Sequence, residues 1–147
     1  MASSKLVLNT KELTEEFFDE TRLLGIMAPM KDYQFCWQLN ALMNMDLRNN
    51  PDIEIQLIRK KRTYYFSVYS YFEDNSSLCH YIYKNHIDGE FLLPEFKHLD
   101  FLYLLKGDVV SNEYIDQVMA GIRLINGVQL VLDLASEKIV HKENLVF

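Results

Sequence analysis

Residues 92–108 read Leu92-Leu93-Pro94-Glu95-Phe96-Lys97-His98-Leu99-Asp100-Phe101-Leu102-Tyr103-Leu104-Leu105-Lys106-Gly107-Asp108. Pro94 cannot donate a backbone hydrogen bond, so it marks the end or the edge of a strand. Polar residues follow it, and the chain then becomes almost wholly apolar over residues 99–105. That run is too short, and too closely bounded by turn residues, to favour a long helix. We therefore predict a buried strand over residues 99–105, entered through a turn at Pro94.

Upstream of this strand, the sequence predicts short extended segments joined by polar turns. Apolar composition or period-two alternation predicts strands at residues 23–28, 53–58, 64–72, 78–84 and 91–93. Arg59, Lys60, Lys61 and Arg62 read as a hairpin turn, and Asp88-Gly89 is typical of a type I′ turn. The last four of these strands, joined in order, predict an antiparallel meander.

Helical spacing predicts two main helices. The first is capped by Asp32, and its apolar residues share one side: Phe35, Leu39, Leu42 and Met43. The second covers residues 113–124, with Ser111 or Asn112 as its cap and Asn126-Gly127 at its end. A strand over residues 128–134 follows it. A right-handed crossover would make that strand parallel to the strand at 99–105, whether or not the two are adjacent.

The two ends of the chain carry weaker patterns. Residues 6–8 read as a short strand, residues 11–18 as a brief helix capped by Thr10, and residues 145–147 as a final extended piece. Together these elements predict one α+β domain over residues 1–147. Its sheet is mostly antiparallel, it carries a C-terminal strand–helix–strand unit, and its helices pack on the sheet.

Composition places the chain among folded proteins of a reducing compartment. Of its 147 residues, 49% are hydrophobic and 24% are charged, which excludes the disordered class. Cys36 and Cys79 have no metal-binding or redox spacing, and no stretch resembles a signal peptide or a membrane span. We therefore expect a cytoplasmic protein without membrane contact. A net charge of −6 disfavours a dedicated nucleic-acid binder without excluding it.

Three segments carry a resemblance to a known family. Residues 93–101 read Leu-Pro-Glu-Phe-Lys-His-Leu-Asp-Phe, residues 31–40 read Lys-Asp-Tyr-Gln-Phe-Cys-Trp-Gln-Leu-Asn, and residues 142–147 read Lys-Glu-Asn-Leu-Val-Phe. Together they resemble the IPExxxVDY proteins, a small bacterial family of unknown function. Pro94, Glu95 and Asp100 keep the naming motif, whereas Phe101 replaces its tyrosine and lacks the hydroxyl. The resemblance implies a bacterial lineage and supplies no mechanism.

The same motif offers the first candidate for catalysis. Glu95, His98 and Asp100 lie within a few residues of one another, and a carboxylate beside an imidazole can perform general acid–base chemistry. The alternative is structural, because carboxylates beside a proline turn often accept backbone N–H bonds. The sequence shows no accompanying nucleophile pattern or phosphate-binding loop, which favours the structural reading.

Cysteine and histidine chemistry are weaker candidates. Cys36 lies just past the first turn of its predicted helix, but a cysteine between Phe35 and Trp37 is more typical of a small packed apolar residue. The histidines are scattered along the chain at His80, His86, His98 and His141. They have no metal-ligand spacing, so we predict neither a metal site nor a cofactor.

RNA binding rests on residues 62–69. Arg62, Tyr64, Phe66 and Tyr69 agree with specified positions of the RNP1 consensus, but its small residues are replaced by Thr63 and Tyr65. Alternating aromatic residues also arise from β propensity alone. The basic residues Arg59 to Arg62 would then contact phosphates or, more simply, form a solvated turn that protects a sheet edge.

A protein partner is the remaining candidate. Tyr65, Tyr69 and Tyr71 alternate along one predicted strand, and Tyr81 and Tyr83 follow on the next. If the helices leave this face open, it is a tyrosine-rich surface of the kind enriched in interfaces. If they cover it, the tyrosines belong to the core.

We rank these candidate functions by how many specific features each requires of the sequence. We expect a non-enzymatic binding or adaptor protein whose partner is another protein, because binding needs only a surface. An RNA- or ribosome-associated factor is the alternative, and a small enzyme around Glu95 and His98 comes third. The sequence does not indicate an oligomeric state.

Overall fold

The computed structural model describes the backbone of residues 2–147 and the side chains of residues 10–147. No helix in this described part is long and apolar enough to cross a membrane. The elements follow in the order α1 (Ala2–Phe17), β1 (Arg22–Met27), α2 (Asp32–Met43), β2 (Arg48–Asn49), β3 (Ile55–Arg59), β4 (Arg62–Phe66), β5 (Val68–Phe72), β6 (Cys79–Lys84), β7 (His86–Ile87), β8 (Glu90–Phe91), η1 (Pro94–Phe96), β9 (Phe101–Lys106), α3 (Asn112–Arg123), β10 (Leu130–Asp133), η2 (Leu134–Ser136) and η3 (Lys142–Leu145).

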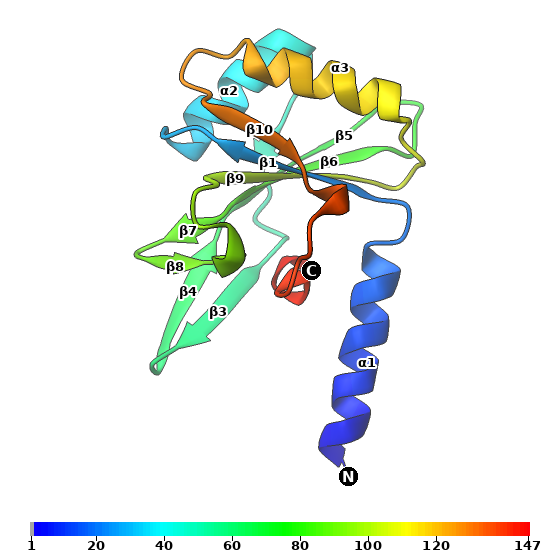
Figure 1. Cartoon of the computed structure of the whole chain (residues 1–147), viewed down its shortest axis with the longest axis vertical. Helices are drawn as coiled ribbons and strands as arrows, with labels where there is room; N and C mark the ends of the chain where they lie inside the picture. The colour runs from blue at the N-terminus through cyan, green and yellow to red at the C-terminus, as the bar shows by residue number, and fades with distance from the viewer. Residues whose placement is uncertain (1) are drawn as a thin grey trace.

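The fold is α+β and is built on one antiparallel sheet of order β10-β1-β9-β6-β5-β2 (Figure 1). β9 is the predicted buried strand, and it lies between β1 and β6. Residues 101–105 are all buried, which explains why this strand is apolar on both faces rather than alternating. The 3₁₀ turn η1 begins at Pro94, so the predicted turn before the strand is confirmed.

The C-terminal strand–helix–strand unit is confirmed as well. β9 and β10 both run antiparallel to β1, so they are parallel to each other with β1 inserted between them. The helix between them, α3, is capped by the Ser111 side chain, which accepts a hydrogen bond from the Tyr114 amide at 3.1 Å. The sequence left open whether the two strands are adjacent. They are not, because β1 lies between them.

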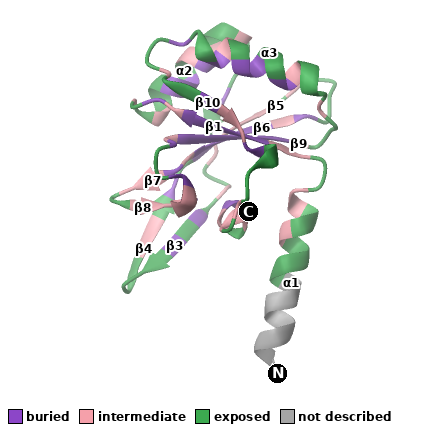
Figure 2. Cartoon of the chain, viewed as in Figure 1, coloured by how far each residue is buried: buried purple, intermediate pink, exposed green. Residues whose placement is uncertain are grey.

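The two faces of the sheet bury two different layers. α2 and α3 cover one face, where Leu24, Ile26, Tyr103 and Leu105 pack beneath them. The other face is covered by the β3–β4 and β7–β8 hairpins, η1 and the C-terminal tail, and it receives Leu23, Leu102 and Leu104. Figure 2 shows buried residues concentrated along the central strands and on the inner side of α3. Both faces of the central strands are therefore occupied.

Two predictions about the ends of the chain are wrong. Residues 6–8 belong to α1 rather than to a strand, and α1 begins well before Thr10. The sequence contains no glycine or proline before Gly25, so nothing interrupts the helix there. At the other end, the tail docks through the 3₁₀ turn η3 rather than as an extended strand, with Leu145 fully buried.

The predicted meander is also wrong in part. The predicted strand over residues 64–72 is two strands that separate at Ser67 and have different partners. β4 pairs only with β3, whereas β5 pairs with β6 and β2 in the main sheet. β7 and β8 form a further hairpin with positive φ at Asp88 and Gly89, as a type I′ turn requires.

Candidate functional site

Asn85 holds the proline turn together. Its side chain is fully buried; its Nδ2 donates to the carbonyls of Phe96 and Leu99 at 3.0 and 2.9 Å, and its Oδ1 accepts from the Leu93 amide at 2.9 Å. Every hydrogen-bonding group of the amide thus points at the backbone of the turn. Sequence analysis did not single out Asn85, because its partners lie 8 to 14 residues away.

Glu95 links the proline turn to the C-terminal tail. Its Oε2 accepts hydrogen bonds from the backbone amides of Val140 and His141 at 2.6 and 2.9 Å, and the His141 Nδ1 lies 3.3 Å from its Oε1. Burial acts to raise the pKa of Glu95. Hydrogen bonds from three backbone amides and from the His141 side chain outweigh it, so that the pKa is lowered. This carboxylate is a structural anchor.

Asp100 has the same kind of role on the opposite side of the turn. Its Oδ2 accepts from the Ala28 amide at 2.8 Å, and its Oδ1 lies 3.0 Å from the Nε2 of His86. It thereby ties the entry of β9 to the end of β1. His98, in contrast, is exposed.

Glu95, His98 and Asp100, the candidate catalytic group of the sequence, are therefore not brought together. Glu95 and Asp100 pair with different histidines, His141 and His86, and both carboxylates are engaged by backbone amides. A general acid or base needs a free atom aimed at substrate, and these oxygens already accept bonds that hold the fold. The structural alternative accounts for both residues.

The five tyrosines do not form one surface. Tyr69 and Tyr71 are partly buried beneath the helices, while Tyr81 and Tyr83 are buried on the other face of the sheet. Tyr65 lies on the β3–β4 hairpin and is exposed. The prediction fails because the break at Ser67 takes β4 out of the main sheet, and because cross-strand pairing places Tyr81 opposite Ser70 rather than beside Tyr71.

The RNP1-like pattern fails for the same reason. Phe66 is buried on the face of the sheet opposite α2 and α3, with Tyr64 packed beside it, whereas Tyr69 lies on the face that these helices cover. These residues cannot present a continuous platform for bases. The basic residues do form the predicted hairpin turn, since Arg59 pairs with Arg62 and Lys60 and Lys61 make the connection.

The cysteine and histidine candidates gain nothing from the structure. Cys36 is buried, and burial raises the pKa of its thiol, assisted by the charge of Asp32. A thiol with a raised pKa is a poor nucleophile at neutral pH. Within residues that the structure describes, no three histidine, cysteine or acidic side chains are grouped to hold a metal ion.

A buried polar chain, which sequence analysis missed, crosses the sheet beneath α3. The ring of His80 lies with its Nδ1 2.5 Å from the Tyr103 hydroxyl and its Nε2 2.5 Å from the Glu73 carboxylate. The Tyr103 hydroxyl is also 3.8 Å from the Met45 sulfur. Burial lowers the pKa of His80, against the opposing effect of Glu73. Glu73 and Met45 are partly exposed and line a hollow of about 290 Å³, whereas His80 and Tyr103 are buried.

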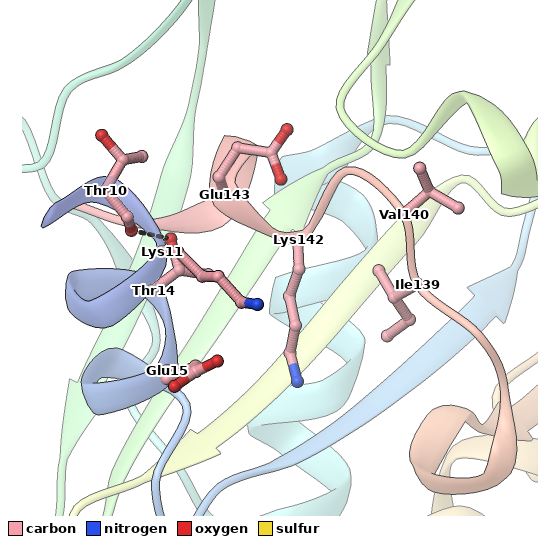
Figure 3. A pocket seen from close by; sticks show the side chains of 8 residues that line it. All are labelled: Thr10, Lys11, Thr14, Glu15, Ile139, Val140, Lys142 and Glu143. Atoms are coloured by element: carbon pink, nitrogen blue, oxygen red, sulfur yellow. Dashed lines mark hydrogen bonds between the residues drawn. The ribbon is translucent and has the colours of Figure 1, made fainter. Parts of the chain in front are cut away.

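A larger groove separates α1 from the C-terminal tail (Figure 3). It encloses about 570 Å³ between residues of α1 and of the tail, namely Thr10, Lys11, Thr14, Glu15, Ile139, Val140, Lys142 and Glu143. Two lysines and two glutamates balance its charge. The groove therefore has no electrostatic preference for an anionic or a cationic ligand.

An apolar patch lies where α2 meets the end of α3. Trp37 is 72% exposed and Leu124 is 77% exposed, and both line a groove of about 340 Å³ with Ala41 and Leu42. Tyr33, one turn before Trp37 on the same side of α2, is also exposed. We call these five residues the α2–α3 patch. Its aromatic residues could have been noticed from the sequence, because Tyr33 and Trp37 fall outside the apolar side of the predicted helix.

Comparison of the chain with protein-family models, with curated proteins and with solved structures gives no match. The resemblance to the IPExxxVDY family therefore stays a prediction.

Proposed function

We propose that the protein is a non-enzymatic binding module that takes an apolar segment of another protein on its α2–α3 patch. The observation that carries the proposal is the exposure of Trp37. Tryptophan is the residue most enriched among those that dominate binding energy, and burying a large apolar side chain stabilises a complex by about 1.5–3 kcal/mol. An exposed tryptophan beside exposed leucines is what such a binding centre requires.

The rim of the patch indicates the chemistry of the partner. Gln38 and Asn126 line the groove together with the apolar residues, and all the described residues that line it are uncharged. A groove without charge favours an apolar segment flanked by hydrogen-bonding groups over a charged one. Two packed helices with a groove between them suit an amphipathic helix of the partner.

The core of the fold does not need these side chains. Phe35, Cys36 and Leu39 supply the buried side of α2, whereas Trp37 points away from it. Replacement of Trp37 by alanine is therefore expected to leave the unfolding midpoint unchanged. Loss of binding in this variant would then report on the surface rather than on folding.

Site-specific photo-crosslinking in the native cell tests the proposal. A photoreactive amino acid at Ala41, inside the groove, should yield a defined crosslinked polypeptide, and the L124Q substitution should abolish it. The same photoreactive group at Val109, which is 70% exposed elsewhere on the molecule, is the matched control and should not yield this product. Equal products from both positions, or a product that is a second copy of this chain, would contradict the proposal.

A further inference from the structure

The β3–β4 hairpin carries exposed residues of a different chemistry from the α2–α3 patch. It projects away from the main sheet on the side opposite α2 and α3 (Figure 1). Arg59, Lys60, Lys61 and Arg62 form its end, and Arg62 pairs with Asp88 at 2.8 Å. Within the described residues, no carboxylate pairs with the other three. The hairpin therefore ends in three uncompensated positive charges.

The turn itself is made of residues that do not suit it. Lys60 and Lys61 have φ values of 51° and 65°, in the left-handed region where glycine and asparagine are favoured. An ordinary L-residue in this region costs about 1–2 kcal/mol. An Asn-Gly turn would make the same connection without that cost. The sequence thus keeps two positive charges at the expense of local stability, which points to a use for the charges.

An aromatic ring lies on the same hairpin. Tyr65 is 59% exposed, and strand alternation places it on the outer face together with Ile58. The inner face is occupied by Ile55 and Leu57, which pack against the core. The outer face consequently offers a flat π surface a few residues from the basic end.

From this combination we propose that the β3–β4 hairpin binds single-stranded nucleic acid, with its cations on phosphates and Tyr65 stacked on a base. Single strands are bound sequence-tolerantly by this pairing of a basic track with aromatic side chains. An acidic protein segment would satisfy the charges and leave the ring of Tyr65 without a planar partner. A single-stranded nucleic acid contacts the positive charges with its phosphates and the Tyr65 ring with a base.

The negative charge of the whole chain does not oppose this binding strongly. A five-residue strand is about 17 Å long, and the Debye length is about 10 Å at 0.1 M salt. The end of the hairpin is therefore screened from charges at the far side of the body. The Asp88 carboxylate, which lies beside the hairpin, is paired with Arg62 at 2.8 Å.

Fluorescence anisotropy with a labelled 12-nucleotide oligouridylate, titrated at 50 to 200 mM KCl, tests the site. Neutralisation of three phosphates predicts a slope of log K against log salt of about −2. The K60N/K61G variant is expected to reduce the slope to about −0.7 while its thermal midpoint stays the same or rises, because the strain is removed. The Y65A variant should weaken binding roughly 5- to 100-fold without changing the slope.

The matched control is K97Q/K138Q, which removes two exposed lysines elsewhere and should leave both affinity and slope unchanged. Four results would overturn the proposal. They are absence of binding at 50 mM KCl, equal binding by the K60N/K61G variant, equal displacement of the RNA by polyaspartate, and a preference for duplex over single strand. Equal displacement by polyaspartate would assign the hairpin to an acidic protein segment.

Discussion

The side chain of Leu99 occupies the space in which Gly25 would carry a β-carbon. A β-carbon built on Gly25 would collide with the Cδ1 of Leu99. Gly25 lies in the centre of β1, between Leu102 of β9 and Leu132 of β10. Glycine weakens a strand interior, so its presence here is explained by the close approach of Leu99, which is fully buried just before β9 begins.

The first prediction follows from this contact. Gly25→Ala should lower the free energy of unfolding by about 1–3 kcal/mol, because the added methyl group overpacks a filled site. Leu99→Ala alone should cost about 2–5 kcal/mol through its cavity. In the double variant the new methyl group enters the space that Leu99 vacates, so the loss measured by urea unfolding should be smaller than the sum. Additive losses would show that the two residues do not compete for the same space.

The second prediction concerns Asp100, whose carboxylate accepts a hydrogen bond from the backbone amide of the fully buried Ala28. Asp100→Ala should cost about 1–3 kcal/mol in urea unfolding, because the Ala28 amide loses its acceptor. Asp100→Asn keeps an acceptor oxygen for Ala28 and can donate to His86, so it should cost less. A Glu90→Ala variant, in the nearby β7–β8 hairpin, is the control and should be almost neutral. Equal losses in the two Asp100 variants would mean that charge, rather than the acceptor, matters.

The elements around Pro94 could be predicted because local chemistry decides them. A proline beside an apolar run bounded by Gly107 leaves few alternatives to a turn followed by a strand. The break at Ser67 is different, since the alternation of residues 64–72 runs through it without interruption. β3 pairs with β4, whereas β6 pairs with β5. This tertiary pairing, rather than the local sequence, decides that β4 leaves the main sheet.

The candidate sites show the same difference between features set by local sequence and features set by tertiary contacts. The basic hairpin end was predictable, because its four residues are consecutive. The roles of Asn85, Glu95 and His80 were not, because the atoms they bind lie in other segments, up to 46 residues away for Glu95. The tyrosines failed for a third reason: strand alternation tells which residues share a face, but not which elements cover that face.

The third prediction is a pH dependence of stability from Glu95. The pKa of Glu95 is lower in the folded chain than its usual value of 4.5, so the carboxylate stabilises the fold above pH 4.5. This contribution is lost as the pH falls through the folded pKa. Glu95→Gln should therefore destabilise the protein at pH 7 by about 1–3 kcal/mol, and the difference from wild type should shrink below pH 4.5.

Chemical denaturation at pH 7, 5, 4 and 3 measures this difference. Glu137→Gln, an exposed carboxylate three to four residues from the amides that Glu95 holds, is the control. It should show no such convergence with wild type. A constant difference between Glu95→Gln and wild type over the whole range would mean that the Glu95 carboxylate is not stabilised by the fold.

The fourth prediction is a second pH effect, from His80, in a higher range. Neutral His80 fits its site with its Nε2–H donating to Glu73 and its Nδ1 accepting from the Tyr103 hydroxyl. Burial raises the pKa of Tyr103, so that hydroxyl stays protonated. A protonated His80 carries a hydrogen on Nδ1 and can no longer accept there. The Tyr103 hydroxyl would then have to turn toward the sulfur of Met45, which is a weak acceptor.

The sign of this effect follows from the lowered pKa of His80. As the pH falls below 6.5 the unfolded chain takes up a proton on His80 before the folded chain does, so stability decreases between pH 6.5 and the folded pKa. NMR titration of the ring should give a pKa below 6.5. Because Glu73 raises the pKa of His80, Glu73→Gln should lower it further and extend the range over which stability is lost. Asp74→Asn removes the neighbouring exposed carboxylate and should leave the titration nearly unchanged; a pKa at or above 6.5, or a rise in Glu73→Gln, would contradict this assignment.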